Sequence, residues 1–273
     1  MTIKIQYCSD LHLEFRNKIK IPKVIKQTNA DILILAGDIC AMAIDEDFSK
    51  FIVFLDIFAS KYKYLLHVSG NHEMYANTNE KLITNENTIN SVVKKLKNLR
   101  KTYPNYLFLD CDSIVLNINN KQYNFIGATL WTFVKPADRE KIQTMMNDYS
   151  SIYIEGHETP VKLNIEEMIK MHKKHKAFIV RAVKKAKDLN HPTILITHHK
   201  PITDTLEKDI TLFTQAYEID MTSIITAPII VSFSGHSHHM LQKIVNNVLY
   251  LSNPLGYPGE KTGFKSDHTI TLD

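Results

Sequence analysis

Five short apolar runs in the sequence each end in polar residues of the same few types. The runs are rich in Ile, Leu and Val, which is typical of buried β-strands. They cover Ile3–Asp10, Asp31–Asp38, Tyr64–Glu73, Thr193–Lys200 and Pro228–His239. We therefore expect five strands, each of which ends in chemically active side chains.

Between these runs, apolar residues recur every three or four positions, which predicts helices over Phe48–Tyr62, Asn87–Lys101 and Asn164–Leu189. Two other segments alternate apolar and polar residues around an Asn-Asn turn, which predicts β-hairpins over Ser113–Trp131 and Gln242–Asn253. Because hairpins are antiparallel, a purely parallel sheet is excluded. The fold class that accommodates every element is a layered α/β sandwich, with two mixed β-sheets flanked by helices.

The length of 273 residues and a hydrophobic content of 44% are enough for one substantial core. We expect a single domain over residues 1–273, with no internal repeat and no low-complexity tract. Residues 131–158 form the least regular segment, which is typical of an insertion or a flap. Ligand sites in such folds lie in the loops at the carboxyl ends of strands.

The formal net charge of +4 comes largely from lysines scattered over helical stretches, so nucleic acid is a possible partner that the charge pattern does not indicate. The three cysteines are widely spaced and form no CxxC motif, which argues against a disulfide framework. The N-terminus becomes charged too early for a signal peptide, and no apolar run is long enough for a membrane span. These features predict a cytoplasmic protein.

The polar residues at the strand ends are all of metal-ligand type: Asp10, His12, Asp38, Asn71, His72, His198, His199, His236, His238 and His239. Carboxylate, imidazole and amide oxygen without thiolate suit Mn, Fe, Zn or Ni. One tetrahedral ion needs about four ligands. A larger set therefore predicts two divalent ions that share a carboxylate, an arrangement suited to displacement at phosphorus.

The same residues form an ordered series of motifs. The series is D-x-H (Asp10–His12), G-D (Gly37–Asp38), G-N-H-E (Gly70–Glu73), T-H-H (Thr197–His199) and G-H-x-H (Gly235–His238). In this order it resembles the signature of the calcineurin-like metallophosphoesterases, and the resemblance runs from Ile3 to about Tyr257. It implies a metal-dependent phosphoesterase that hydrolyses phosphomonoesters or phosphodiesters with a metal-activated hydroxide. Its cofactors would be two divalent ions, with Mn as the first choice.

The resemblance also implies a role for each matching residue. One metal is expected to take Asp10, His12 and His238, and Asp38 bridges to a second metal held by Asn71, His198 and His236. His72 is expected to bind no metal and to protonate the leaving oxygen. A carboxylate should orient the His72 ring, and Asp10 is the candidate for this second, catalytic role.

Several positions keep alternatives at this stage. His198 and His199 point to opposite sides of an extended loop, so either could be the ligand, and similar motifs favour His198. His199, Glu73 and His239 are candidates to face substrate or to support the ligands, although Glu73 could equally be a solvated acid. Tyr75, Asn253 and Tyr257 are candidates for the rim of the cleft.

Some nearby residues are not expected to take part. His67 lies within a strand and reads as a core histidine, whereas His172 and His175 belong to a lysine-rich helix and read as solvated. In the resembling family a further acidic residue often follows Gly37-Asp38, but here residues 39–41 are Ile-Cys-Ala. An additional carboxylate in the site is therefore in doubt.

Two other functions remain compatible with the motifs. A nuclease would use the same two-metal chemistry, but the sequence contains no evident basic groove with interleaved aromatic residues. A catalytically inactive scaffold would be free to lose its ligands and His72, yet all of them are present. The expected partner is a phosphate-ester substrate, no membrane is expected, and the sequence does not indicate an oligomeric state.

Overall fold

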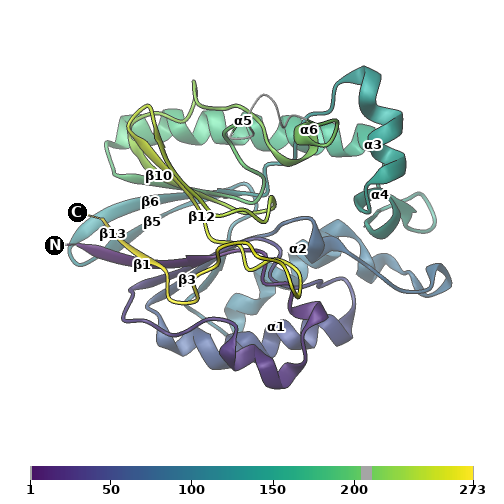
Figure 1. Cartoon of the computed structure of the whole chain (residues 1–273), viewed down its shortest axis with the longest axis horizontal. Coiled ribbons are helices and arrows are strands. Elements are labelled where there is room, and N and C mark those ends of the chain that lie inside the picture. The colour runs from purple at the N-terminus through teal and green to yellow at the C-terminus, as the bar shows by residue number, and fades with distance from the viewer. Residues whose placement is uncertain (1, 204–210, 273) are drawn as a thin grey trace.

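Two β-sheets lie face to face between outer layers of helices (Figure 1). The computed structural model describes residues 2–203 and 211–272. The first sheet has the strand order β13-β1-β2-β3-β4, in which β1 to β4 are parallel and β13 is antiparallel. Its strands are β1 (Ile3–Cys8), β2 (Ile32–Ala36), β3 (Tyr64–Val68), β4 (Tyr106–Phe108) and β13 (Thr269–Leu272).

The second sheet has the strand order β11-β12-β10-β9-β6-β5. Its four inner strands are parallel, and the edge strands β11 and β5 are the antiparallel arms of the two predicted hairpins. The predicted fold class is thus confirmed. The strands are β5 (Asp112–Ile118), β6 (Lys121–Ala128), β9 (Thr193–Thr197), β10 (Ile229–Ser234), β11 (Leu241–Val245) and β12 (Val248–Ser252).

The alternation of side chains along each inner strand divides the core into layers. Ile3 and Ile5 of β1 point into the space between the sheets, where they join Phe125 and Ile194 of the second sheet. In β2, Ile32 and Ile34 point the same way, whereas Leu33 between them points outward to the helices. Because both faces of these strands are covered, the strands read as continuous apolar runs.

The predicted helices form and cover the outer faces of the sheets (Figure 1). Helices α1 (Asp45–Phe58) and α2 (Ile89–Asn98) pack on the first sheet, and α5 (Ile165–Leu189) runs along the second. The Asn164 side chain caps α5 by accepting from the Glu167 amide, and Asn190 ends it in a left-handed conformation. No helix in the described ranges is both long enough and apolar enough to cross a membrane.

The irregular segment 131–158 contains short elements. They are α3 (Arg139–Met145), α4 (Asp148–Ser151) and β7 (Tyr153–Ile154), which pairs with β8 (Val161–Lys162). A further short helix, α6 (Thr214–Tyr217), lies over the same end of the second sheet (Figure 1). That segment 131–158 moves as a flap stays a prediction.

Of the predictions for histidines outside the motifs, the one for His67 is confirmed and the one for His172 and His175 was wrong. His67 is a core residue as expected, and its Nδ1 lies 2.7 Å from the Tyr106 hydroxyl. The prediction of solvated histidines on α5 was wrong, because His172 and His175 are both buried. Nδ1 of His172 lies 2.5 Å from the Trp131 carbonyl, and His175 accepts a hydrogen bond from the Leu130 amide. The lysines around them made a partly buried helix face look exposed.

Candidate functional site

The carboxyl ends of β1, β2 and β3 face those of β9 and β10, and all five motifs meet there. Three groups of side chains place their potential ligand atoms within 4.8 Å of one another. These groups share members, so they form one continuous cluster. They are Asp10–His12–His238, His12–Asp38–His72 and Asp38–His198–His236.

The backbone around this cluster has an unusual conformation. Five of its residues have a positive φ of 45° to 70°, namely Asp10, His12, Asp38, His236 and His238. Non-glycine residues rarely adopt this region, and such strain concentrates at functional sites. Each turn redirects a side chain toward the space between the sheets.

Glycine is required at two points where loops meet. Gly37 has a φ of +85°, and a Cβ on it would collide with the His198 ring. A Cβ on Gly70 would overlap the Asp38 carboxylate. These absent side chains let the loops after β2, β3 and β9 converge.

The structure separates the two adjacent histidines after β9. Nδ1 of His198 lies 3.0 Å from the Ala36 carbonyl, and its Nε2 lies 3.2 Å from Oδ1 of Asn71 and 3.3 Å from Oδ2 of Asp38. His199 is also buried but turns its Nδ1 toward the Thr129 carbonyl, while its ring packs against His236. His198 therefore belongs to the cluster, as expected, whereas His199 packs against the cluster through the His236 ring.

Electrostatics also differ between these two rings. Burial lowers the pKa of His198, but the Asp38 charge and hydrogen bond outweigh it and raise this pKa to about 10. Burial, reinforced by the neighbouring His198, lowers the pKa of His199 to about 3. Burial raises the pKa of Asp38, yet the surrounding histidines hold it well below its usual range. The cluster thus strongly favours an ionised Asp38 beside positive charge.

Asn71 is oriented by a residue from the irregular segment. Its Nδ2 donates to Oδ1 of Asp148 at 2.8 Å and to the Tyr75 hydroxyl at 3.2 Å, and Tyr75 itself donates to Asp148 at 2.6 Å. These contacts turn Oδ1 of Asn71 toward His198. Burial raises the pKa of Asp148 even though both hydrogen bonds act to lower it.

Glu73 is fully buried and ties the loops after β2 and β3 together. Its carboxylate accepts hydrogen bonds from the backbone amides of Asp38, Ile39 and Gly70 at 2.6–2.9 Å. The prediction that Glu73 supports the ligands fits this position, and the alternative of a solvated acid was wrong. His239, in contrast, is exposed, and its Nδ1 lies 2.5 Å from the Ser237 carbonyl.

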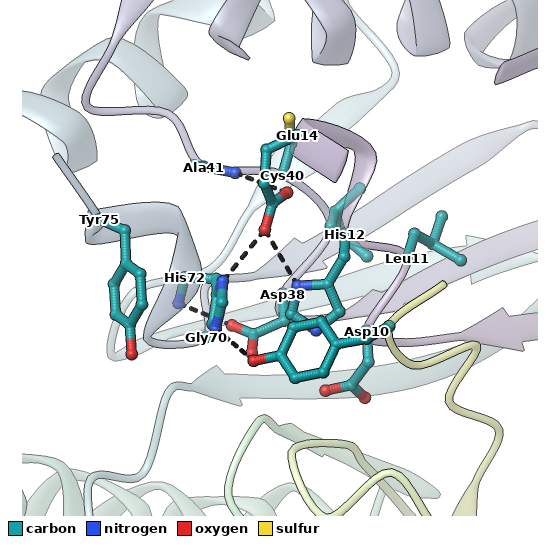
Figure 2. A network of polar contacts seen from close by, with 12 residues as sticks. Asp10, Leu11, His12, Glu14, Asp38, Cys40, Ala41, Gly70, His72 and Tyr75 are labelled. Carbon is teal, nitrogen blue, oxygen red and sulfur yellow. Dashed lines mark hydrogen bonds and ion pairs between the residues drawn. The ribbon is translucent and has the colours of Figure 1, made fainter. Parts of the chain in front are cut away.

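The expected partner of His72 was wrong. Asp10 turns away from His72 and accepts from the His236 backbone amide at 3.0 and 3.1 Å. Nδ1 of His72 instead lies 3.0 Å from Oε1 of Glu14, as Figure 2 shows. Glu14 thus supplies the additional carboxylate that residues 39–41 lack. Sequence reasoning missed it because an acid two residues after His12 looks like an ordinary loop residue.

A cavity of about 1000 Å³ opens onto the cluster. His72, Tyr75 and Tyr257 line it, as does Asp148, whereas Asn253 is buried and donates to the Tyr7 and Lys265 carbonyls. Of the three rim candidates, the two tyrosines reach the cavity and Asn253 does not. The Tyr257 hydroxyl lies 2.9 Å from Nε2 of His72.

The family model of the calcineurin-like phosphoesterases matches residues 3–240. The chain belongs to this family. The resemblance seen in the motifs is thereby confirmed, and with it the general expectation of a phosphoesterase.

One relative and two solved structures are similar to this chain over most of its length. An uncharacterized protein, L509 of Acanthamoeba polyphaga mimivirus, is 28% identical over 98% of this chain and 96% of its own length. The crystal structure of phosphopantetheinyl hydrolase from Mycobacterium tuberculosis superposes with a TM-score of 0.68 at 17% identity, covering 93% of this chain and 90% of that one. TT1561 of Thermus thermophilus superposes with a TM-score of 0.53 at 12% identity, covering 93% and 90%. At such identities these structures support the fold alone.

In this calcineurin-like phosphoesterase the ring nitrogens of His12 and His238 are arranged as ligands of a cation would be. Nδ1 of His12 faces the Glu14 carboxylate and Nδ1 of His238 faces that of Glu260, so both Nδ1 atoms must carry hydrogen. Two neutral rings would set both Nε2 lone pairs against each other at 3.2 Å, so without a metal one ring must hold a second proton. Burial lowers the pKa of His238, but the hydrogen bonds and charges of Asp10 and Glu260 outweigh it and raise this pKa to about 9. A divalent ion can take the place of that proton, and carboxylates behind histidine ligands are typical of metal sites.

The second group has the same property. Because Nδ1 of His198 faces the Ala36 carbonyl, its Nε2 faces two acceptors, Oδ1 of Asn71 and Oδ2 of Asp38, so without a metal this nitrogen must hold a proton that a divalent ion can replace. Nε2 of His236 is buried and has no hydrogen-bond partner in the described structure. The residues present therefore fit divalent metal.

Proposed function

We propose that this protein hydrolyses phosphate esters of small organic molecules with the help of two divalent metal ions. One ion would be held by Asp10, His12 and His238. The other would be held by Asn71, His198 and His236, with Asp38 shared between them. The observation that carries this proposal is the position of Asp38, whose carboxylate lies in one group with His12 and in another with His198 and His236. Mn is the first choice of metal, and Fe, Zn or Ni also suit these ligands.

When bound, such a pair of ions acidifies a water molecule to a nucleophile and neutralises charge on the phosphate oxygens. The side chains of the protein have separate tasks. His72 faces the cavity and does not belong to either metal set, so it is placed to give a proton to the leaving oxygen. Burial lowers the pKa of His72, but the charge of Asp38 and the hydrogen bond to Glu14 outweigh it and raise this pKa above its usual value.

The residues that line the cavity suit a small phosphate ester better than a nucleic acid. Its wall carries Asp148, Glu218 and Glu260, and in the described part of the lining Lys200 is the one lysine or arginine. Lys200 is already paired with Glu218 at 3.3 Å. A phosphate backbone would need an excess of cations. Met145, Met146 and Phe213 add apolar surface that suits an organic leaving group.

The test compares p-nitrophenyl phosphate with bis-p-nitrophenyl phosphate in the presence of Mn²⁺. We expect hydrolysis by the native protein, and the ratio of the two rates assigns the monoester or the diester. His72→Ala should keep its metal content but lose about 10²–10⁴-fold in turnover on esters with poor leaving groups, the contribution typical of general acid catalysis. Full activity of His72→Ala on such esters would contradict the role of His72. Metal-dependent cleavage of labelled DNA in preference to both esters would favour the nuclease.

A further inference from the structure

A single carboxylate contacts two histidines that have different roles in the proposed reaction. Glu14 follows β1 in a short 3-10 helix, and its side chain is 4% exposed. Oε1 lies 3.0 Å from Nδ1 of His12 and 3.0 Å from Nδ1 of His72. Figure 2 shows Glu14 above the two rings, with dashed lines to both.

Glu14 cannot easily turn away from these rings. Its other oxygen, Oε2, accepts from the Ala41 amide at 3.1 Å, and its backbone carbonyl accepts from Nζ of Lys50 at 2.6 Å. Because Oε2 accepts from the Ala41 amide, Oε1 is the acceptor that both Nδ1 atoms face, and each Nδ1 donates to it.

This arrangement fixes which nitrogen of each ring is available. With hydrogen on Nδ1, the neutral His12 ring presents a lone pair on Nε2, which faces His238 at 3.2 Å. With Nδ1 turned to Glu14, His72 directs Nε2 to the cavity, where it lies 2.9 Å from the Tyr257 hydroxyl and is the nitrogen that would carry the proton for the leaving oxygen. One buried carboxylate therefore sets a ligand and a proton donor at once.

We propose that Glu14 is the positioning residue of this site, holding His72 ready to protonate the leaving oxygen and His12 ready to bind metal. The proposal rests on the phosphoesterase function above. As an oxygen from water bonds to phosphorus, the P–O bond to the leaving group breaks, and its electron pair stays on the leaving oxygen, which takes the Nε2 proton of His72. Solvent returns a proton to His72 at the end of the cycle, while Glu14 neither gains nor loses one.

Glu14→Gln is a sharp test because the amide cannot make all three contacts. With its oxygen toward the histidines, its NH₂ group faces the Ala41 N–H, which places two donors together. With its NH₂ group toward the histidines, both rings must accept at Nδ1 and carry hydrogen on Nε2, which removes the ligand lone pair of His12. The first orientation keeps both Nδ1 contacts but loses the Ala41 hydrogen bond and the negative charge, whereas the second reverses both tautomers, and the volume of the side chain is kept in either case.

The kinetic readout is the dependence of the rate on the leaving group. A p-nitrophenolate departs without a proton, whereas an alkoxide needs one. We expect Glu14→Gln to lose about 10²-fold or more on an alkyl phosphate ester, the range of general acid catalysis, but less than about tenfold on the matching p-nitrophenyl ester. Rates are compared at saturating Mn²⁺, and elemental analysis reports the metal content of each variant.

Glu73→Gln is the matched control. It is another buried glutamate near the cluster, but its carboxylate binds mainly backbone amides and, in the described structure, makes no hydrogen bond to the ring of His12 or His72. We expect it to lower both rates in the same proportion. Equal losses on the two esters for Glu14→Gln would overturn the proposal, because a merely structural role acts on both alike.

The second readout needs neither metal nor activity. Nitrogen-15 NMR of the imidazole rings in the metal-free protein reports which nitrogen carries hydrogen. We expect Nδ1–H for His12 in the native protein and loss of this preference in Glu14→Gln. Glu14→Asp, which keeps the charge on a shorter stem, should retain the preference in part, and it serves if Glu14→Gln fails to fold. An unchanged His12 tautomer in both variants would overturn the proposal even if the native protein hydrolysed neither ester.

Discussion

The two sheets contribute to the site in different ways. The loops of the first sheet, after β1, β2 and β3, are held by two buried glutamates, Glu14 and Glu73. In the loops of the second sheet, His238 has as its carboxylate support Glu260, whose side chain is 40% exposed. His236, in the same loop, leaves a buried ring nitrogen without a partner in the described structure.

This difference indicates that the two halves of the site are stabilised in different ways. Carboxylates bound to backbone amides inside the protein fix the first-sheet half before any ligand arrives. In the second-sheet half, His238 relies on a carboxylate near solvent and should depend more on what is bound in the cavity. Substitutions in the first half should therefore affect stability as well as chemistry, whereas those in the second half should affect mainly metal binding.

The largest effect is expected where the two halves meet. Asp38 accepts from the His72 amide at 2.8 Å and lies 3.3 Å from Nε2 of His198. Asp38→Ala should therefore remove the residue shared by both metal sets and lower turnover by about 10³-fold or more, since metals contribute several kcal/mol to such reactions. Metal analysis and Mn²⁺-dependent hydrolysis measure this together. An unchanged metal content would contradict the shared role.

The support of the first half can be broken without touching a proposed ligand. Glu73→Ala would leave the amides of Asp38, Ile39 and Gly70 buried without their acceptor. Each such loss costs about 1–3 kcal/mol, with partial relief from water, so we expect about 3 kcal/mol of destabilisation in urea unfolding. A loss below about 1 kcal/mol would show that the two halves are supported equally.

The corresponding change in the second half should be milder for the fold. Glu260 accepts from Nδ1 of His238 at 2.6 Å and from the Tyr257 amide at 2.8 Å, both near solvent. Glu260→Gln should weaken metal binding by about tenfold, the lower end for such supporting carboxylates. Its unfolding free energy should change by less than about 0.5 kcal/mol. Isothermal titration with Mn²⁺ beside urea unfolding tests this contrast, and a large loss of stability with intact affinity would reverse it.

The smallest effect concerns the rim of the cavity. Burial raises the pKa of Tyr257, so its hydroxyl keeps its proton at neutral pH beside Nε2 of His72. Tyr257→Phe removes one hydrogen bond worth about 1 kcal/mol, and we expect turnover to change about fivefold with unchanged metal content. Steady-state kinetics on the alkyl ester measure it. A loss as large as that of His72→Ala would instead make Tyr257 a proton donor in its own right.

The sequence predicted the five motif-bearing strands, three long helices and both hairpins, because their apolar periodicity is strong and local. Strand β13 was missed, since its four residues matter only through pairing with β1 at the opposite end of the chain. Strand β4, with three residues, is too short for a pattern to register.

For the candidate site too, the sequence predicted the residues that lie in local motifs and missed those that only the fold brings together. Every predicted metal ligand lies in the cluster or, in the case of Asn71, in contact with it, because ordered motifs at strand ends identify such residues. Glu14, Asp148 and Glu260 could not be singled out, because a carboxylate that supports a ligand looks like any surface acid until the fold places it. The wrong assignment of Asp10 as the partner of His72 has this origin.

The central claim is that two metal ions held between the sheets make this protein a phosphoesterase. The most direct measurement is a titration of the metal-free protein with Mn²⁺, in which bound metal and ester hydrolysis are followed in the same samples. We expect no hydrolysis without metal and full activity only as about two ions bind per chain. Full hydrolysis by the metal-free protein, or activity complete at a single bound ion, would contradict it.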